Sequence, residues 1–194
     1  MPIQYGGNLN HNKLAANMTI ATPKQCRLFY ALWPDDVTRS ALARLQFELH
    51  GNKTRYRNFH VTLAFLGDQE PTLLPTLQGI LAQLDGSEMS LQIDKLGYFP
   101  RNRIGWAGMS QPSDALNRLQ VLLTEKLKEN QVRFESRALF KPHLTLVRDA
   151  DAPAVVEFAP IIWHAKQVTL VQSVLQDDGP HYQVLASHWL QRAR

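Results

Sequence analysis

The stretch FHVTLAFLG, at residues 59–67, determines how the rest of this sequence is interpreted. It has a second copy, because KPHLTLVRD at residues 141–149 repeats the pattern His-x-Thr-Leu. In each stretch a histidine precedes a short apolar run rich in β-branched residues, which is typical of a buried strand. Two strands with the same polar start indicate a duplicated unit.

Successive side chains of a strand point to opposite faces, so each copy divides into a polar and an apolar set. The apolar side chains are expected to pack in the core, and the polar side chains are expected to face a cleft. The predicted polar face carries His60, Thr62 and Ala64 in the first copy and His143 and Thr145 in the second; the predicted core face carries Val61, Leu63 and Phe65, then Leu144 and Leu146.

Helices and strands surround the two copies in a similar order. Strands are expected at 26–34, 61–67, 89–99, 103–109, 143–148, 167–175 and 181–190, and helices at 34–50, 71–86 and 112–130. The segment at 153–165 is rich in proline and is expected to be a loop. The last two strands should form an antiparallel hairpin around QDDGP, at 176–180. This order predicts an α+β fold with two similar lobes.

The length and composition indicate a globular protein of one domain. The chain has 194 residues and 44% apolar residues, enough for one domain with a sizeable core. Residues 1–23 are polar and are expected to be a disordered leader or a remnant of cloning, in which Met18 is a candidate for the natural start, so the domain is placed at 24–194. No apolar run suits a signal peptide or a membrane span, and the single Cys26 fits a reducing compartment, so a cytoplasmic location is expected.

Paired histidines suit acid–base catalysis at a phosphodiester. An imidazole titrates near neutrality, so one ring can accept a proton while the other donates one. A threonine hydroxyl beside each ring can bind a phosphate oxygen. If a pseudo-twofold axis relates the lobes, the two polar pairs face each other across a cleft. The net charge of +4 is consistent with an anionic ligand such as nucleic acid.

Other interpretations of the same residues were weighed. One His-x-Thr-Leu alone is common in ordinary strands, whereas two matched copies are hard to explain structurally. A metal site is disfavoured because neither copy adds a second ligand, as H-x-H or HExxH would, and we expect no cofactor. His164, His181 and His188 are expected to be structural or exposed.

The chain resembles the two-histidine phosphoesterase superfamily, and within it the bacterial RNA 2′,3′-cyclic phosphodiesterases, also called 2′-5′ RNA ligases. The resemblance runs from Arg27 to the end of the chain. It rests on RLFYALWPDD at 27–36, NFHVTLAFLG at 58–67 and FKPHLTLVRD at 140–149. It implies two lobes of antiparallel sheet and helix with the active cleft between them.

The resemblance also implies roles for individual residues. His60 with Thr62, and His143 with Thr145, would form two half-sites. His60 would be the acid that protonates O3′ and His143 the base that activates water. Arg148 would contact phosphate, although strict alternation sends it to the opposite face unless the strand bulges or ends near Val147.

Looser candidates for contacts with RNA are Tyr56, Arg57, Arg101 and Phe65, of which Phe65 is expected in the core by its parity. The expected substrate is RNA with a 2′,3′-cyclic phosphate or 2′-5′ linkage, including tRNA-derived ends, and we expect a monomer that does not bind membranes. Two alternatives stay open, a phosphodiesterase for small cyclic nucleotides or 2′-5′ oligonucleotides and a non-catalytic RNA-binding module. The direction of the reaction, hydrolysis or ligation, does not follow from the sequence.

Overall fold

The computed structural model describes residues 25–136, 139–152, 156–177 and 179–192, and the expected leader lies outside these ranges. The elements in chain order are β1 (Cys26–Leu32), α1 (Asp36–Phe47), β2 (Asn52–Lys53), the 3-10 helix η1 (Tyr56–Asn58), β3 (Val61–Gln69), η2 (Pro71–Leu73), α2 (Leu74–Ala82), β4 (Met89–Ile93), β5 (Lys95–Phe99), η3 (Pro100–Asn102), β6 (Ile104–Gly108), α3 (Asp114–Glu129), β7 (His143–Arg148), β8 (Ile161–Ala165), β9 (Gln167–Gln176) and β10 (Gly179–Trp189).

One large antiparallel sheet organises the chain in the order β10-β9-β1-β3-β7-β6-β5, with the short β2 also paired to β7. Strands β4 and β8 form a separate two-stranded sheet. The order is close to symmetric about the β3–β7 junction, since β1 flanks β3 as β6 flanks β7. The predicted α+β fold with a duplicated unit is confirmed.

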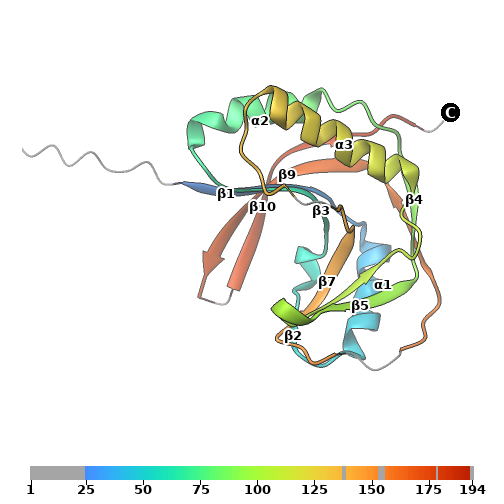
Figure 1. Ribbon diagram of the computed structural model, residues 1–194. Coiled ribbons are helices and arrows are strands. Elements are labelled where there is room, and N and C mark those ends of the chain that lie inside the picture. Colours follow the sequence, from blue (N-terminus) through green and yellow to red (C-terminus); the bar gives the residue numbers. More distant parts are fainter. Residues whose placement is uncertain (1–24, 137–138, 153–155, 178, 193–194) are drawn as a thin grey trace, which may run out of the picture.

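The helices cross between the two halves of the large sheet. Helix α1 follows β1 but contacts β7, and α3 follows β6 but contacts β3. Figure 1 shows α2 and α3 together on the side of β1, β9 and β10, whereas α1 lies with β7 and β5. Each half is therefore covered by a helix that belongs, in sequence, to the other half.

Local sequence explains where the helices begin and which face they bury. The side chain of Asp35 accepts a hydrogen bond from the backbone N–H of Thr38, and Ser113 does the same for Leu116. These caps satisfy backbone donors that the first turn of a helix leaves without partners. Along α3 the residues at helical spacing are all buried: Leu116, Leu119, Leu123 and Leu127.

Two expectations about strands need correction. Residues 161–165 lie in the segment expected to be a loop, yet they form β8, because β4 supplies a partner with Leu91 opposite Trp163. Residues 89–99 form two strands in different sheets, β4 and β5, rather than one. The predicted hairpin of β9 and β10 is confirmed, with Asp178 in its connection outside the described residues.

Among the described residues, every helix is too short or too polar to cross a bilayer.

Candidate active site

The two His-x-Thr segments meet at the centre of the large sheet. Val61 of β3 pairs with Leu144 of β7 in antiparallel register, and both side chains are fully buried. Extending this register by one residue in each direction places Thr62 opposite His143 and His60 opposite Thr145. Since side chains alternate, all four polar groups lie on the face opposite the buried pair, as neighbours on adjacent strands.

A bulge in β3 corrects the face predicted for Phe65. Thr62 pairs with Ala31 and Phe65 pairs with Phe29, so the register of β3 against β1 shifts between them. The two residues between, Leu63 and Ala64, are both buried in the main core. Phe65 therefore returns to the face of Thr62, and the expectation that it packs in the main core while Ala64 shares the face of His60 is wrong. Strict alternation fails here because a bulge inserts one extra residue.

The corresponding bulge in β7 has the same effect on Arg148. Thr145 pairs with Trp106 and Val147 pairs with Gly105, with a register shift between these pairs. Leu146 and Val147 are both buried, and Arg148 is exposed. The condition on which Arg148 could face the site, a bulge near Val147, is therefore met. Arg148 and Phe65 occupy equivalent positions, each five residues after the histidine of its copy.

Hydrogen bonds orient the ring of His60. Its Nδ1 lies 2.7 Å from the backbone carbonyl oxygen of Asn58, which can only accept, so Nδ1 carries the proton and donates. Its Nε2 lies 3.0 Å from Oγ1 of Thr62, whose hydroxyl then donates to the neutral ring. The side chain of Asn58 donates in turn to the carbonyl oxygen of Pro180, at 2.8 Å, which links this segment to β10.

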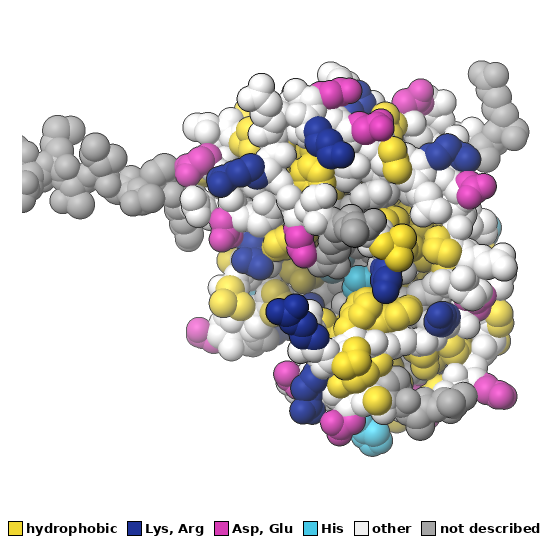
Figure 2. Space-filling view, viewed as in Figure 1, with side chains coloured by type: hydrophobic (Ala, Val, Ile, Leu, Met, Phe, Trp, Pro, Cys, Tyr) yellow, Lys and Arg dark blue, Asp and Glu magenta, His cyan; other side chains and the backbone are white. Residues whose placement is uncertain are grey.

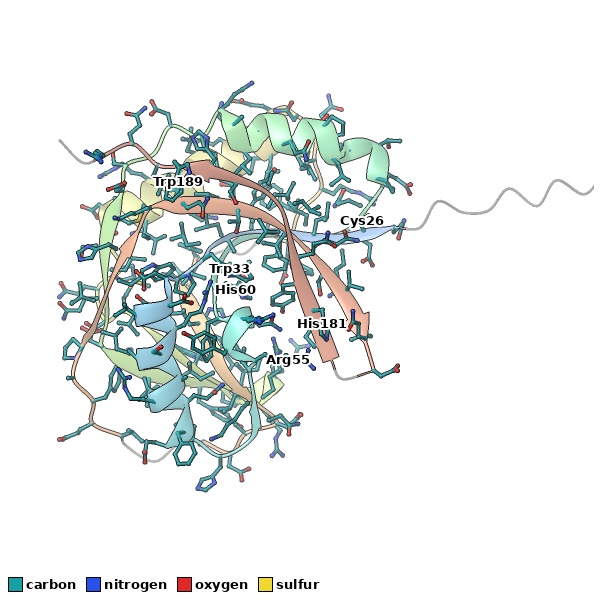
Figure 3. All side chains as sticks on the ribbon, turned by 180° about the vertical axis from the view of Figure 1, so that it is seen from behind. Cys26, Trp33, Arg55, His60, His181 and Trp189 are labelled. Carbon is teal, nitrogen blue, oxygen red and sulfur yellow. The ribbon has the colours of Figure 1, made fainter. Side chains whose placement is uncertain are left out.

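Three aromatic rings surround the His60 imidazole. Trp33 stacks on it with the ring centroids 5.6 Å apart, Phe29 lies 4.9 Å away, and Tyr182 meets it edge-on at 5.3 Å. Figure 3 shows Trp33 directly beside His60. These rings shield part of the imidazole from water, and His60 is half-buried.

Burial lowers the pKa of His60 from 6.5 to about 4, although the hydrogen bond to Asn58 raises it; the charges of His143 and Arg148 lower it further. At neutral pH the ring is therefore uncharged in the unliganded protein. Both His143 and Arg148 belong to β7, so this strand contributes to the electrostatic environment of His60.

His143 is held in the same manner as His60. Its Nδ1 lies 2.7 Å from the carbonyl oxygen of Lys141, two residues earlier. Nδ1 of His60 has the same contact with the carbonyl oxygen of Asn58, which is also two residues earlier. Both rings thus direct Nε2 away from the backbone. Phe99 meets His143 edge-on with centroids 5.0 Å apart, and Trp106 lies 6.1 Å from it.

The looser candidates for RNA contacts are less closely tied to this face. The hydroxyl of Tyr56 donates to the carbonyl oxygen of Asp36, at 3.0 Å, and lies 3.1 Å from Oγ of Ser40, so this side chain is engaged with α1. Arg57 is exposed on η1, and Arg101 is exposed on η3, two residues after Phe99. Of these three, Arg101 lies nearest in sequence to a ring that contacts His143.

Sequence reasoning missed Tyr182 of β10. The ring of Tyr182 contacts Phe29 and Trp33 as well as His60. Burial raises the pKa of its phenol, whereas the positive charges of Arg148 and Arg27 lower it, so both guanidinium groups act on this part of the face. Only the pairing of β10 with β9, and of β9 with β1, brings Tyr182 here. No local signal around residue 182 indicates that neighbourhood.

His181 and Arg55 form a further contact beside this face. A guanidinium nitrogen of Arg55 lies within hydrogen-bond distance of Nε2 of His181, which accepts when the ring is neutral. Figure 3 shows the two side chains next to each other where β10 approaches η1. His181 is expected to be structural or exposed, and this contact fits the first of these alternatives.

The surroundings of the site are basic. Figure 2 shows a histidine in a hollow at the centre of one face, with Lys and Arg side chains around it. Among the residues that the structure describes, no group of three or more His, Cys, Asp and Glu side chains could hold a metal ion.

Comparison with known proteins agrees with this fold and this arrangement of residues. Residues 33–177 match the model of the 2'-5' RNA ligase superfamily, and the chain belongs to this family. Among curated proteins it is 32% identical over 99 residues to the RNA 2′,3′-cyclic phosphodiesterase of Escherichia coli strain K12, a match that covers 51% of this chain and 56% of that protein. It is 28% identical over 174 residues to the protein of the same name from Archaeoglobus fulgidus, covering 82% of this chain and 97% of the relative.

A solved structure extends the likeness to the whole fold. The crystal structure of Escherichia coli LigT complexed with 3′-AMP superposes with a TM-score of 0.76 and 26% identity, covering 86% of this chain and 99% of LigT. The family predicted from the two sequence motifs is therefore confirmed.

Proposed function

We propose that this protein hydrolyses the 2′,3′-cyclic phosphate ends of RNA to 2′-phosphates, using His60 and His143 as its acid and base. One observation carries the proposal. The two His-x-Thr pairs lie side by side on one sheet face, and in each a backbone carbonyl two residues earlier accepts a hydrogen bond from Nδ1. Nε2 is thereby directed toward this face, where that of His60 meets the hydroxyl of Thr62. The curated relatives named RNA 2′,3′-cyclic phosphodiesterase, and the LigT complex with 3′-AMP, support the choice of substrate class.

The proposed reaction is an in-line displacement at phosphorus. Nε2 of His143 takes a proton from water as the water oxygen bonds to phosphorus. The bond from phosphorus to O3′ breaks, and Nε2 of His60 protonates the leaving O3′. The hydroxyls of Thr62 and Thr145 and the guanidinium of Arg148 would bind the phosphate oxygens, where negative charge increases in the transition state. If a 5′-hydroxyl replaces water, the same steps join the RNA ends through a 2′-5′ linkage.

The low pKa of His60 sets a condition on this mechanism. An acid must carry its proton before O3′ leaves, yet the ring is neutral at pH 7 in the unliganded protein. A bound phosphate anion raises the pKa of a nearby histidine, because opposite charges favour the protonated form. We therefore expect the imidazole of His60 to take up a proton when the substrate binds.

The test is hydrolysis of an oligoribonucleotide that ends in a 2′,3′-cyclic phosphate. His60→Ala and His143→Ala should each lower kcat by about 10²- to 10⁴-fold, the usual contribution of one acid or base. His164→Ala is the matched control, since His164 is exposed on β8 outside the site. Far-UV circular dichroism verifies that each variant is folded, and chromatography of the product separates a 2′-phosphate from a 3′-phosphate. An unchanged rate in either site variant would refute the paired-histidine mechanism.

The finer expectations about the cellular role stay predictions. They are tRNA-derived ends as the natural substrate, a monomeric state and a cytoplasmic location.

A further inference from the structure

Two aromatic rings beside His143 lie outside both hydrophobic clusters of the protein. Phe99 and Trp106 are half-buried, and neither packs in the main core or in the smaller cluster around Phe29. They lie against each other instead, with ring centroids 5.3 Å apart and planes tilted by 31°. Large aromatic side chains normally contribute to a core, so a pair that does not do so requires another explanation.

Two glycines, which have no side chains, leave the space that the Trp106 indole occupies. A Cβ atom at Gly97, on the neighbouring strand β5, would overlap Cζ2 of the indole, and one at Gly108 would lie 2.9 Å from Cζ3. The ring therefore lies directly over the backbone of both glycines, along the sheet surface. Its Nε1 is buried and has no hydrogen-bond partner among the described residues, so the polar edge of the ring does not hold it in place.

This ring pair shares the face of the catalytic groups. Trp106 pairs with Thr145 across β6 and β7, and Gly97 pairs with Trp106 across β5 and β6. Side chains of directly paired residues point to the same side of a sheet, so Trp106 and Thr145 are neighbours on one face. Phe99 lies two residues beyond Gly97 on the same strand and shares this face, which agrees with its contact to His143.

The aromatic rings around His60 differ, because they already have partners. Phe29 is buried in the smaller cluster, with Trp33 and Tyr182 packed against it. The guanidinium of Arg27 lies 4.9 Å above the ring of Phe65. Of the two aromatic groups on this face, the one beside His143 is therefore the one that belongs to neither hydrophobic cluster.

We propose that Phe99 and Trp106 form a stacking platform for the nucleobase of the terminal nucleotide whose cyclic phosphate lies at the two histidines. Aromatic rings with basic side chains nearby are the usual means of holding unpaired nucleotides, because every base has a π face and every phosphate a negative charge. Exposed Arg101 lies two residues after Phe99, and exposed Lys95 lies two residues before Gly97 on the same face of β5. The platform rests on the proposed function and adds to it a binding site for the base.

The test compares two substrates that differ only in the base: adenosine 2′,3′-cyclic phosphate and 1-O-methylribose 2,3-cyclic phosphate. Trp106→Leu removes the indole, and Gly97→Ala displaces it without removing it. Both variants should lower kcat/KM about tenfold for the adenosine substrate, a typical contribution of one stacked base, and leave the methylriboside unchanged.

Matched controls exist for both substitutions. Trp189→Leu removes an exposed tryptophan at the end of β10, which Figure 3 shows well away from His60. Gly79→Ala adds a Cβ on α2 where nothing lies within 4 Å. Both controls should act on the two substrates as the wild-type protein does. Equal losses on the two substrates in the Trp106 and Gly97 variants would show a structural role and overturn the platform, as would no loss on either.

A binding measurement separates failure of the platform from failure of the proposed function. Calorimetry gives the Kd of adenosine 2′-phosphate and of 1-O-methylribose 2-phosphate without any turnover. If the wild-type protein does not hydrolyse the oligoribonucleotide that ends in a 2′,3′-cyclic phosphate, the proposed function fails, and the platform is then judged by binding alone. A roughly tenfold weaker Kd for the adenosine ligand alone in Trp106→Leu supports it. An unchanged Kd overturns it.

Discussion

At the scale of single residues, the environment of His60 has a consequence for stability. The folded protein holds this ring neutral down to a pKa of about 4, whereas an unfolded chain protonates it near 6.5. As the pH falls from 6.5 toward 4, the unfolded chain binds a proton that the folded protein does not. The free energy of unfolding should therefore decrease across this window, by up to about 2 kcal/mol at pH 5 from this residue alone.

Urea unfolding at pH 7 and pH 5 checks this prediction with His60→Gln. Glutamine keeps a polar side chain at the position but does not titrate, so the loss of stability between the two pH values should be smaller in the variant than in the wild-type protein. Equal losses in the two proteins would mean that His60 titrates normally when folded.

At the scale of elements, the two bulges determine which side chains reach the site. Each central strand buries two consecutive residues after its threonine, Leu63 with Ala64 and Leu146 with Val147. The residue that follows then returns to the site face. One copy supplies a ring at this position, Phe65, and the other a guanidinium, Arg148. The duplicated backbone thus carries two chemically different side chains at equivalent positions.

Arg148→Ala should weaken the binding of adenosine 2′-phosphate about tenfold or more, because a hydrogen bond between charged groups contributes about 1.5–3 kcal/mol. Calorimetry at low and moderate salt measures the change. Arg118→Ala is the matched control, since it removes the same charge from the exposed face of α3. If both variants bind adenosine 2′-phosphate with the same Kd, Arg148 does not contact the phosphate and contributes only to the overall positive charge of the protein.

Much of this site could be predicted from the sequence, because local rules govern most of it. Alternation places His60 with Thr62 and His143 with Thr145, and repetition of the pattern indicates that the two pairs act together. Phe65 was assigned to the wrong face, since a bulge depends on pairing with a neighbouring strand and leaves no clear mark in one sequence. Tyr182 and Trp106 were missed because strand pairing, which joins distant residues, brings them to the histidines.

The fold shows the same division between local and distant information. The helix caps at Asp35 and Ser113 and the leucine stripe of α3 depend on residues close together in the sequence, and helices were predicted at 34–50 and 112–130. Strand β8 was not, since it follows a proline and exists through its pairing with β4, far away in the sequence. Its short run Ile161–Ala165 is too brief to separate from a loop by periodicity alone.

At the scale of the whole molecule, the site lies at the junction of the two halves. Strands β3 and β7 come from different copies of the duplicated unit, and their pairing at Val61 and Leu144 brings the two histidines together. Neither half carries both imidazoles, so catalysis by the proposed mechanism requires that the junction be intact. Helix α1 contacts β7 and helix α3 contacts β3, so each helix packs on the central strand of the other half and stabilises the junction.

The crossed helices predict that the halves unfold together. Leu42 on α1 and Leu123 on α3 are fully buried in the same core, so Leu42→Ala and Leu123→Ala should each lower the free energy of unfolding by about 2–5 kcal/mol. In urea, circular dichroism and tryptophan fluorescence should give one coincident transition for the wild-type protein and for both variants. Val121→Ala, on the exposed face of α3, should change stability by less than about 0.5 kcal/mol. Two separate transitions in Leu42→Ala would instead show that α1 stabilises only one half, and the chain would then consist of two independently folding lobes rather than the single domain that its sequence predicts.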